Sequence, residues 1–174
     1  MSKVCIVTGA SRGLGRGIAK VLAEERSATV YATARSEIAL NDLASSINNN
    51  TGVIHPIVLD QSDDSAVEKF ITTVAEKEGR IDLLVNSAYG GLTAMTPHFG
   101  KPFWERPISV FDASIDIGLR SAFVSSAIVA PHMVSQKSGL IVQVSSFGGH
   151  SYLFDVGYGV GKAGLDRLSA DMAT

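Results

Sequence analysis

The sequence holds only one cysteine, Cys5, among 174 residues, and this excludes a disulfide within the chain. A chain without disulfides suits a reducing compartment, so we expect a cytoplasmic protein. Cys5 lies in the apolar run 4–7, where a small buried hydrophobe is a better interpretation than a nucleophile. An association with an organelle membrane through a segment beyond residue 174 is left open.

Long hydrophobic runs and an excess of positive charge are also missing. No window reaches about 18 uninterrupted apolar residues, so we expect no membrane span. The apolar stretch 121–134 contains three serines, a proline and a histidine, which is typical of a buried helix. The 15 basic and 17 acidic side chains give a net charge of −2, without the basic excess of a nucleic-acid-binding protein. The four histidines share no metal-ligand spacing, so no metal site is expected.

Short apolar runs alternate with longer helical patterns along the chain. Strands are expected at 4–8, 29–32, 53–59, 81–85 and 139–145, and helices at 14–25, 37–47, 62–78, 109–133 and from 158 onward. Strands separated by helices predict a parallel sheet with helices on both faces. The fold class is therefore α/β, a doubly wound, Rossmann-type, three-layer sheet. The length predicts a single dinucleotide-binding domain over residues 1–174.

A glycine-rich turn lies directly between the first expected strand and the first helix. Gly9, Gly13 and Gly15 give the spacing Gly-x-x-x-Gly-x-Gly. Glycines let the backbone turn sharply and approach a ligand without a Cβ in the way. A helix N-terminus that follows such a turn offers N–H groups and partial positive charge to a phosphate. The turn predicts a pyrophosphate site, and a tight turn without a ligand is the alternative.

Two arginines bear on the choice of dinucleotide. An NAD site of this kind usually has an acidic residue at the end of the second strand. Here that strand is followed by Arg35, and Arg12 lies within the glycine-rich turn. A guanidinium matches a ribose 2′-phosphate, so the pair favours NADP(H) over NAD(H). The alternative is two solvated surface arginines.

A Tyr-x-x-x-Lys motif stands in the last expected helix. Residues four apart share one helix face, so Lys162 can lie near Tyr158. A cation close to a phenol favours the phenolate form and brings the group toward the range of a general acid/base. Such motifs are common on surfaces, so this one gains weight from the pair Ser145-Ser146 at the end of the fifth expected strand.

Together, the run 8–15 and the serine, tyrosine and lysine set resemble the short-chain dehydrogenase/reductase family. The resemblance implies a cofactor site formed by Gly9, Ser11, Arg12, Gly13, Leu14, Gly15, Arg35, Asp60, Asn86 and Lys162. Asp60 would contact the adenine, although a helix N-cap preceding Ser62 is an equal interpretation. Asn86 would lie on the cofactor side and stabilise its strand.

The resemblance also implies a catalytic set of Ser146, Tyr158 and Lys162, in which the serine hydroxyl binds the substrate oxygen and the lysine binds the nicotinamide ribose. The spacing to the tyrosine favours Ser145, whereas the alignment of the strand favours Ser146. We choose Ser146 because loop length varies more than strand register.

The chain departs from the family pattern at three places. Where the family usually reads Asn-Asn-Ala-Gly, this chain reads Asn86-Ser87-Ala88-Tyr89, with Tyr89 in place of the glycine. Gly118 stands where many members carry a catalytic asparagine. Another group or water could take over the asparagine's part. These features resemble the family's mammalian "member one" branch, which is associated with NADPH-dependent reduction of steroid and xenobiotic carbonyls. Family members are usually longer, so we expect a C-terminally truncated chain that lacks the last strands.

These observations predict an NADP(H)-dependent oxidoreductase that reduces a small-molecule carbonyl to an alcohol, with Tyr158 as general acid/base. The full-length form is expected to be a homo-oligomer without a nucleic-acid partner. The alternatives are a nucleotide-binding module and an inactive fragment, both without turnover.

Overall fold

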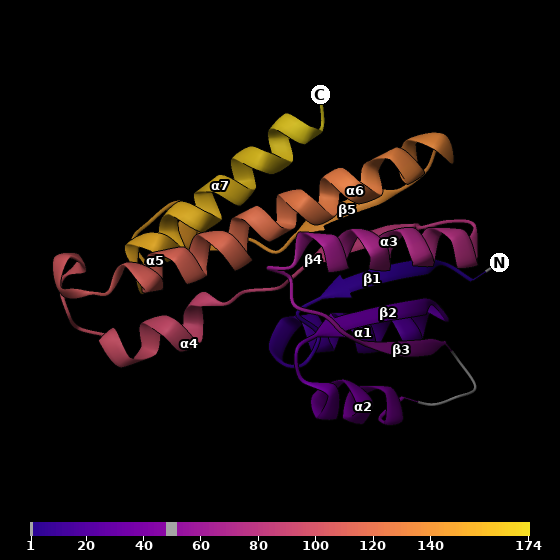
Figure 1. Ribbon diagram of the computed structural model, residues 1–174, viewed down its shortest axis with the longest axis horizontal. Helices are drawn as coiled ribbons and strands as arrows, with labels where there is room; N and C mark the ends of the chain where they lie inside the picture. Colours follow the sequence, from indigo (N-terminus) through magenta and orange to yellow (C-terminus); the bar gives the residue numbers. More distant parts are fainter. Residues whose placement is uncertain (1, 48–51) are drawn as a thin grey trace. The chain divides into compact units, whose positions relative to one another are not determined.

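A computed structural model of the chain describes residues 2–47 and 52–174. In these residues one parallel sheet has the strand order β3-β2-β1-β4-β5 (Figure 1). The strands are β1 (Val4–Thr8), β2 (Thr29–Ala34), β3 (Val53–Val58), β4 (Leu83–Asn86) and β5 (Leu140–Gln143). The predicted doubly wound α/β fold is confirmed, because β1 pairs in parallel with β2 on one side and β4 on the other.

Each predicted helical region contains a helix with different bounds, and the short helix at 91–95 was not predicted. The helices are α1 (Gly13–Arg26), α2 (Glu37–Ser45), α3 (Asp64–Glu78), α4 (Gly91–Met95), α5 (Ile108–Ile115), α6 (Ser121–Ser135) and α7 (Val156–Met172). Three short 3-10 turns are η1 (Thr96–His98), η2 (Phe103–Glu105) and η4 (Phe147–Gly149). The helix expected at 109–133 is interrupted by a π-helical turn, η3 (Asp116–Arg120).

The start of α3 corrects two sequence interpretations. The helix begins at Asp64 and not at Ser62, because the Asp63 carboxylate caps it by accepting the Ala66 amide at 3.0 Å. Asp60 is therefore not the N-cap of this helix. Its carboxylate instead accepts the Ser62 amide at 2.9 Å and closes a turn just before the helix.

The chain forms two compact units. Unit 1 consists of Met1–Ala88 and Val124–Val142, and unit 2 consists of Tyr89–Phe123 and Gln143–Thr174. The expectation of a single domain over residues 1–174 stays a prediction. All candidate cofactor residues except Lys162 belong to unit 1, and the whole candidate catalytic set belongs to unit 2.

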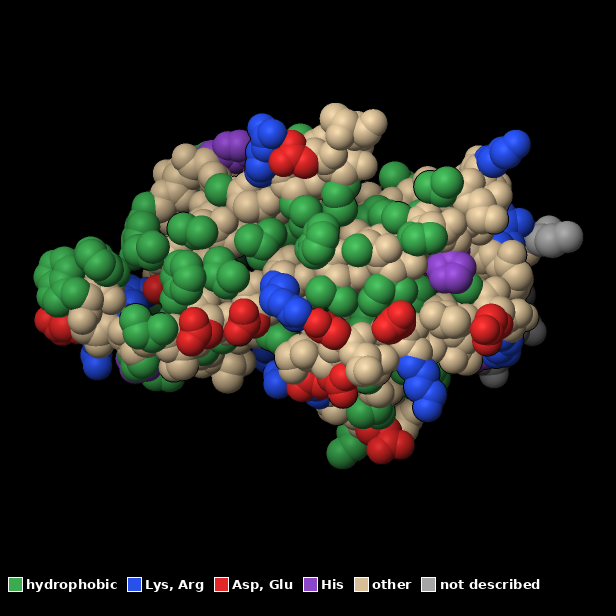
Figure 2. Space-filling view, turned by 45° about the horizontal axis from the view of Figure 1, so that its top comes forward, with side chains coloured by type: hydrophobic (Ala, Val, Ile, Leu, Met, Phe, Trp, Pro, Cys, Tyr) green, Lys and Arg blue, Asp and Glu red, His purple; other side chains and the backbone are tan. Residues whose placement is uncertain are grey.

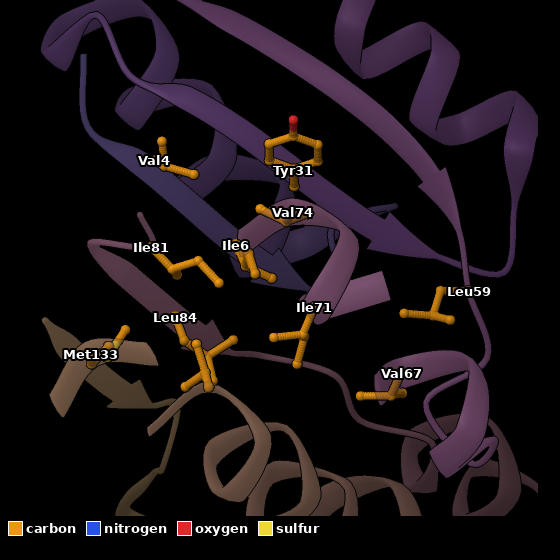
Figure 3. Close-up of a cluster of buried hydrophobic side chains, with 11 residues drawn as sticks. Val4, Ile6, Tyr31, Leu59, Val67, Ile71, Val74, Ile81, Leu84 and Met133 are labelled. Atoms are coloured by element: carbon orange, nitrogen blue, oxygen red, sulfur yellow. The ribbon is translucent and has the colours of Figure 1, made fainter. Parts of the chain in front are cut away.

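The core of unit 1 lies between the sheet and two helices (Figure 3). Its buried members are Val4, Ile6, Tyr31, Leu59, Val67, Ile71, Val74, Ile81, Leu84, Val129 and Met133. Successive strand residues point to opposite faces, so Val4 and Ile6 face α3 and α6. Cys5 then points to the opposite face, and burial, followed by the charge of Asp82, raises the pKa of its thiol to about 11. The thiol stays protonated at neutral pH and acts as a small buried side chain.

The helical stretch Ile108–Ser135 is long and apolar enough, by length and composition, to cross a membrane. Core helices pass the same test, and Val129 and Met133 from this stretch lie in the core of unit 1. Other members are exposed, among them Phe123 and Val134. Figure 2 shows that hydrophobic side chains reach the surface of the face it presents. The absence of a membrane span stays a prediction.

Candidate cofactor and catalytic site

The turn after β1 requires glycine at position 9 for two independent reasons. Gly9 has a φ of +68°, in the left-handed region that disfavours side chains. A Cβ at this position would also lie 2.7 Å from the Cα of Ala88. A Cβ on Gly13, by contrast, would meet nothing within 4 Å, so the space beside that residue is open. The turn is built as the sequence predicts, with tight backbone packing on one side and open space on the other.

Thr8 ties this turn to the segment after β4, a role that the sequence analysis missed. Its Oγ1 accepts hydrogen bonds from the amides of Ser87 and Ala88, both at 3.1 Å. The contact fixes the carboxyl ends of two neighbouring strands, where ligands of doubly wound sheets bind. A polar residue that ends the apolar run 4–7 was the available signal.

The N-terminus of α1 suits the pyrophosphate of a dinucleotide. Arg12 is its N-cap residue, and the Arg12 side chain makes no capping hydrogen bond there. The first turn also contains no acidic side chain. The first N–H groups of a helix have no partner within the helix, so they can donate to a ligand. Leu14 in the first turn is 62% exposed, which leaves this end of the helix accessible.

Backbone hydrogen bonds draw together the strand ends that carry Arg12, Arg35 and Asp60. The Ala10 amide donates to the Thr33 carbonyl at 3.0 Å, and the Leu59 amide donates to the Ala34 carbonyl at 2.9 Å. All three charged side chains are exposed. The amide and hydroxyl of Ser62 lower the pKa of Asp60, and the charge of Arg35 adds to this effect. Two exposed guanidinium groups and one exposed carboxylate thus lie on the segments that follow the carboxyl ends of β1, β2 and β3.

Asn86, at the end of β4, is buried in unit 1. Its Nδ2 donates to the hydroxyl of Ser126 on α6 at 3.1 Å. The bond holds the strand end against the helix, as expected of a strand-stabilising residue. Its contact with a cofactor stays a prediction, as do those of Ser11, Leu14 and Gly15.

The three candidate catalytic residues lie together in unit 2. The Ser146 Oγ lies 2.7 Å from the Tyr158 Oη. The Ser145 hydroxyl points elsewhere and donates to the Lys162 carbonyl at 3.3 Å. Lys162 follows Tyr158 by four residues on α7, and its ammonium nitrogen lies 5.8 Å from the centre of the Tyr158 ring. Of the two serines that the sequence left open, the geometry places Ser146 beside the tyrosine hydroxyl.

Lys162 is a buried cation held by a backbone group. Its side chain donates to the Val144 carbonyl at 2.6 Å, and the residue is only 8% exposed. Burial lowers the pKa of Lys162, and the carboxylate of Asp166 acts in the opposite direction. The amino group of Lys162 thus lies near the Tyr158 ring, and its burial disfavours the charged form.

A buried ion pair fixes the start of the helix that carries Tyr158. Asp155 caps α7 by accepting the Gly157 amide at 2.7 Å, and its other oxygen lies 2.6 Å from Arg106. Arg106 also donates to the Phe154 carbonyl at 3.0 Å. Phe154 has a φ of +64°, and its ring packs edge-on against Tyr158 at a centroid distance of 5.5 Å. No local sequence pattern predicts the ion pair between Arg106 and Asp155, because 49 residues separate them.

Tyr89 lies among the same groups. Its hydroxyl is 3.0 Å from the Ser114 hydroxyl, and its ring meets the Tyr158 ring edge-on at 5.5 Å. Burial raises the pKa of Tyr89 to about 12, so it stays a neutral phenol at physiological pH. From the sequence, Tyr89 is a departure from the usual family pattern and one of the features shared with the "member one" branch, and neither predicts these contacts.

Metal-binding side chains do not gather in the described part of the chain. Residues 2–47 and 52–174 contain no group of three or more histidine, cysteine or acidic side chains that could hold an ion.

A family model described as short chain dehydrogenase matches residues 3–174. The chain belongs to the short-chain dehydrogenase/reductase family. The mouse protein dehydrogenase/reductase SDR family member 1 is 46% identical over 172 residues, which are 98% of this chain and 55% of that protein. The predicted resemblance to the "member one" branch is thereby confirmed, and the chain spans about half the length of this family relative.

Solved structures of the family share the fold. A metagenomic short-chain oxidoreductase in complex with NADP is 32% identical, with a TM-score of 0.87 over 98% of this chain and 75% of the other. An NAD⁺-bound xylitol dehydrogenase is 28% identical, with a TM-score of 0.87 over 98% of this chain and 64% of the other. Relatives of this short-chain dehydrogenase/reductase therefore include complexes with either dinucleotide.

Proposed function

We propose that this protein reduces a carbonyl group of a small molecule to an alcohol, or catalyses the reverse oxidation, with NADP(H) as cofactor. One observation carries the proposal: the hydroxyl oxygens of Ser146 and Tyr158 lie 2.7 Å apart. Two hydroxyls at this separation can both donate to a single substrate oxygen placed beside them. Such paired donors stabilise the charge that develops on a carbonyl oxygen during reduction.

Each residue of the set has a distinct part in the proposed reaction. Ser146 and Tyr158 hold the carbonyl oxygen by hydrogen bonds, and the Tyr158 hydroxyl then gives its proton to that oxygen. The positive charge of Lys162 favours the phenolate that remains. When bound, the reduced nicotinamide supplies the hydride for the carbonyl carbon. In the direction of oxidation, Tyr158 takes the proton back from the alcohol.

The preference for NADP(H) rests on Arg12 and Arg35. Both are exposed on segments that follow strand ends drawn together by backbone hydrogen bonds, and Arg12 is the N-cap residue of α1. A guanidinium binds a phosphate dianion by charge-assisted hydrogen bonds. We expect Arg35→Gln to lower kcat/KM for NADPH by about 10- to 100-fold, since such a bond contributes about 1.5–3 kcal/mol. The value for NADH should change little, and a preference of the wild type for NADH would contradict this assignment.

The matched control for this variant is Arg26→Gln. Arg26 is an exposed arginine of the same unit that lies in the last turn of α1, at the far end of the helix from the glycine-rich turn. The Arg26→Gln variant loses the same positive charge as Arg35→Gln, so comparing the two separates the loss of a local phosphate contact from a change in net charge. We expect no change in its NADPH-to-NADH ratio.

The decisive experiment compares binding with turnover. NADPH binding is titrated by fluorescence, and NADPH oxidation is followed by absorbance with a panel of diketones, steroids and xenobiotic ketones. We expect Tyr158→Phe to bind NADPH but to lose about 10²- to 10⁴-fold in turnover. Tyr152→Phe, at an exposed tyrosine of the same unit, is the control.

The outcomes separate the alternatives. Binding of NADPH by the wild type without turnover would indicate a nucleotide-binding module. Neither binding nor turnover would indicate an inactive fragment. Turnover that survives in Tyr158→Phe would overturn the proposed role of this residue.

A further inference from the structure

Position 118 has no side chain, and another residue fills the space that a side chain would use. Gly118 lies in the π-helical turn η3, a kind of turn that is frequent at functional sites. A Cβ on Gly118 would lie 3.0 Å from Cδ2 and 3.2 Å from Cε2 of Tyr89. The chain therefore carries a large residue at 89 and none at 118, the reverse of the family pattern described above.

Tyr89 is held in place by its hydroxyl. The Oη lies 3.0 Å from the Oγ of Ser114, a fully buried residue whose hydroxyl also donates to the Val110 carbonyl at 3.2 Å. A Cβ on Gly91 would collide with the tyrosine hydroxyl, so glycine leaves the room that it needs. These contacts give the Tyr89 ring a defined position and orientation within unit 2.

The held ring faces the lysine of the catalytic set. The Lys162 ammonium nitrogen lies 5.3 Å from the centre of the Tyr89 ring, closer than its 5.8 Å from the centre of Tyr158. A cation within about 6 Å of an aromatic centroid is attracted by the ring, and more strongly where water is excluded. Lys162 is buried, so this attraction offsets part of the cost of burying its charge.

We propose that Tyr89 is a positioning residue for Lys162: its ring replaces the side chain missing at Gly118 and holds the ammonium charged beside Tyr158. The inference rests on the proposed function, because it assigns Tyr89 a part through Lys162. In the described part of the chain, the Val144 carbonyl accepts the hydrogen bond of the ammonium, the Tyr158 ring lies 5.8 Å from it, and the charge of Asp166 on α7 also acts on it. Tyr89 adds to these a face that attracts cations and does not itself ionise at physiological pH.

The test measures the pKa of Lys162 without cofactor or substrate. The chain is labelled with carbon-13 lysine, the Lys162 signal is assigned by its loss in Lys162→Arg, and the signal is titrated by NMR. We expect Tyr89→Leu to lower the Lys162 pKa by about 0.4–1.5 units, which is the cation–π contribution expressed as a pKa shift. Tyr89→Phe keeps the ring but loses the hydrogen bond to Ser114 that holds it, so it should lower the value by clearly less than Tyr89→Leu.

Phe99→Leu is the matched control, because it removes a ring of the same unit that packs against Phe154 and not against Lys162. An unchanged Lys162 pKa in folded Tyr89→Leu would overturn the proposal, as would an equal fall in Tyr89→Phe. Should Tyr89→Leu fail to fold, Tyr89→Met fills irregular space without a ring and should give the same fall. A wild type without turnover would remove the proposed function and leave this comparison of pKa values intact.

A second test asks whether positions 89 and 118 share one space. Gly118→Asn alone should lower the urea midpoint of unfolding, because its side chain must displace the Tyr89 ring. Combined with Tyr89→Gly, which empties that space, it should lower the midpoint by less than the two single changes together. Strictly additive changes in the midpoint would contradict a shared space.

Discussion

The ammonium nitrogen of Lys162 lies 2.6 Å from the carbonyl oxygen of Val144, two residues before Ser146. The next residue, Ser145, donates its hydroxyl back to the Lys162 carbonyl at 3.3 Å. Two hydrogen bonds thus join the segment after β5 to the helix that carries Tyr158. A backbone carbonyl does not titrate, so any change of charge in this link falls on Lys162. The serine and the lysine are therefore positioned by one shared stretch of backbone.

Removing the charge of Lys162 should impair turnover. We expect Lys162→Met to lower kcat by about 10²- to 10³-fold, the usual effect of losing one preorganised electrostatic group. NADPH oxidation at saturating substrate measures it. Lys101→Met removes an exposed lysine of the same unit and should change kcat little. Comparable losses in both variants would argue against a specific role for Lys162.

The ion pair between Arg106 and Asp155 should be essential for stability. Their side chains are only 7% and 5% exposed, and removing one partner leaves a buried charge without compensation. We expect Arg106→Met to lower the free energy of unfolding by about 3–5 kcal/mol, measured by urea denaturation. Adding Asp155→Asn removes the leftover charge and should recover part of the loss. A loss below about 1 kcal/mol would show that the pair behaves as an exposed one.

Gly9→Ala should damage both the fold and the binding of NADPH. The new Cβ would approach the Cα of Ala88 to 2.7 Å on a backbone with a φ of +68°. We expect a loss of about 1–3 kcal/mol in the free energy of unfolding and weaker NADPH binding. Gly17→Ala is the control, because its Cβ would meet nothing within 4 Å inside α1. That variant should gain about 0.5–1 kcal/mol from helix propensity, and equal losses in both would contradict the packing argument.

Asp82 should make stability depend on acid pH. Burial tends to raise its pKa, but the hydrogen bonds from Arg80, Lys3 and the Val4 amide outweigh this and lower it to about 2. Because the pKa falls on folding from its ordinary value of 3.8, the stabilisation is present above pH 3.8 and is lost as the pH falls toward 2. We expect Asp82→Asn to cost about 2 kcal/mol at pH 7 and much less near pH 2, by urea denaturation.

The control for that titration is Asp42→Asn. Asp42 pairs with Arg16 at 2.8 Å, but its side chain is 73% exposed, so the pair is screened by solvent. We expect a loss of at most about 1 kcal/mol at pH 7. A similar pH dependence in both variants would show that Asp82 has no special part in acid unfolding.

The order of strands and helices could be predicted because it depends on local patterns. The apolar run 4–7, the glycines after it and the capping serine Ser36 act within a few residues of one another, and the structure has each where it was expected. The first and last residues of these elements were predicted less accurately. The strand expected at 81–85 spans Leu83–Asn86, and the Ile81 amide bonds to the side chain of Gln136 instead of a strand partner.

The candidate site was less predictable where it depends on distant partners. The choice between Ser145 and Ser146 turned on which hydroxyl lies beside the Tyr158 hydroxyl, because both serines bond to α7, and strand register alone left both possible. The burial of Arg106 against Asp155 depends on packing across 49 residues. Gly118 was seen as a missing side chain, but only the folded chain shows that the Tyr89 ring occupies the vacated space.

The division of the chain into interleaved segments has a consequence for its synthesis on the ribosome. Unit 1 needs both Met1–Ala88 and Val124–Val142, so it stays incomplete while the intervening segment is translated. Its core lacks Val129 and Met133 until then. The nascent chain therefore presents an apolar sheet face, including Ile6 and Leu84, for the time that about 40 further residues take, a few seconds at ordinary translation rates. Chaperones that bind exposed apolar strands would meet this protein during that interval.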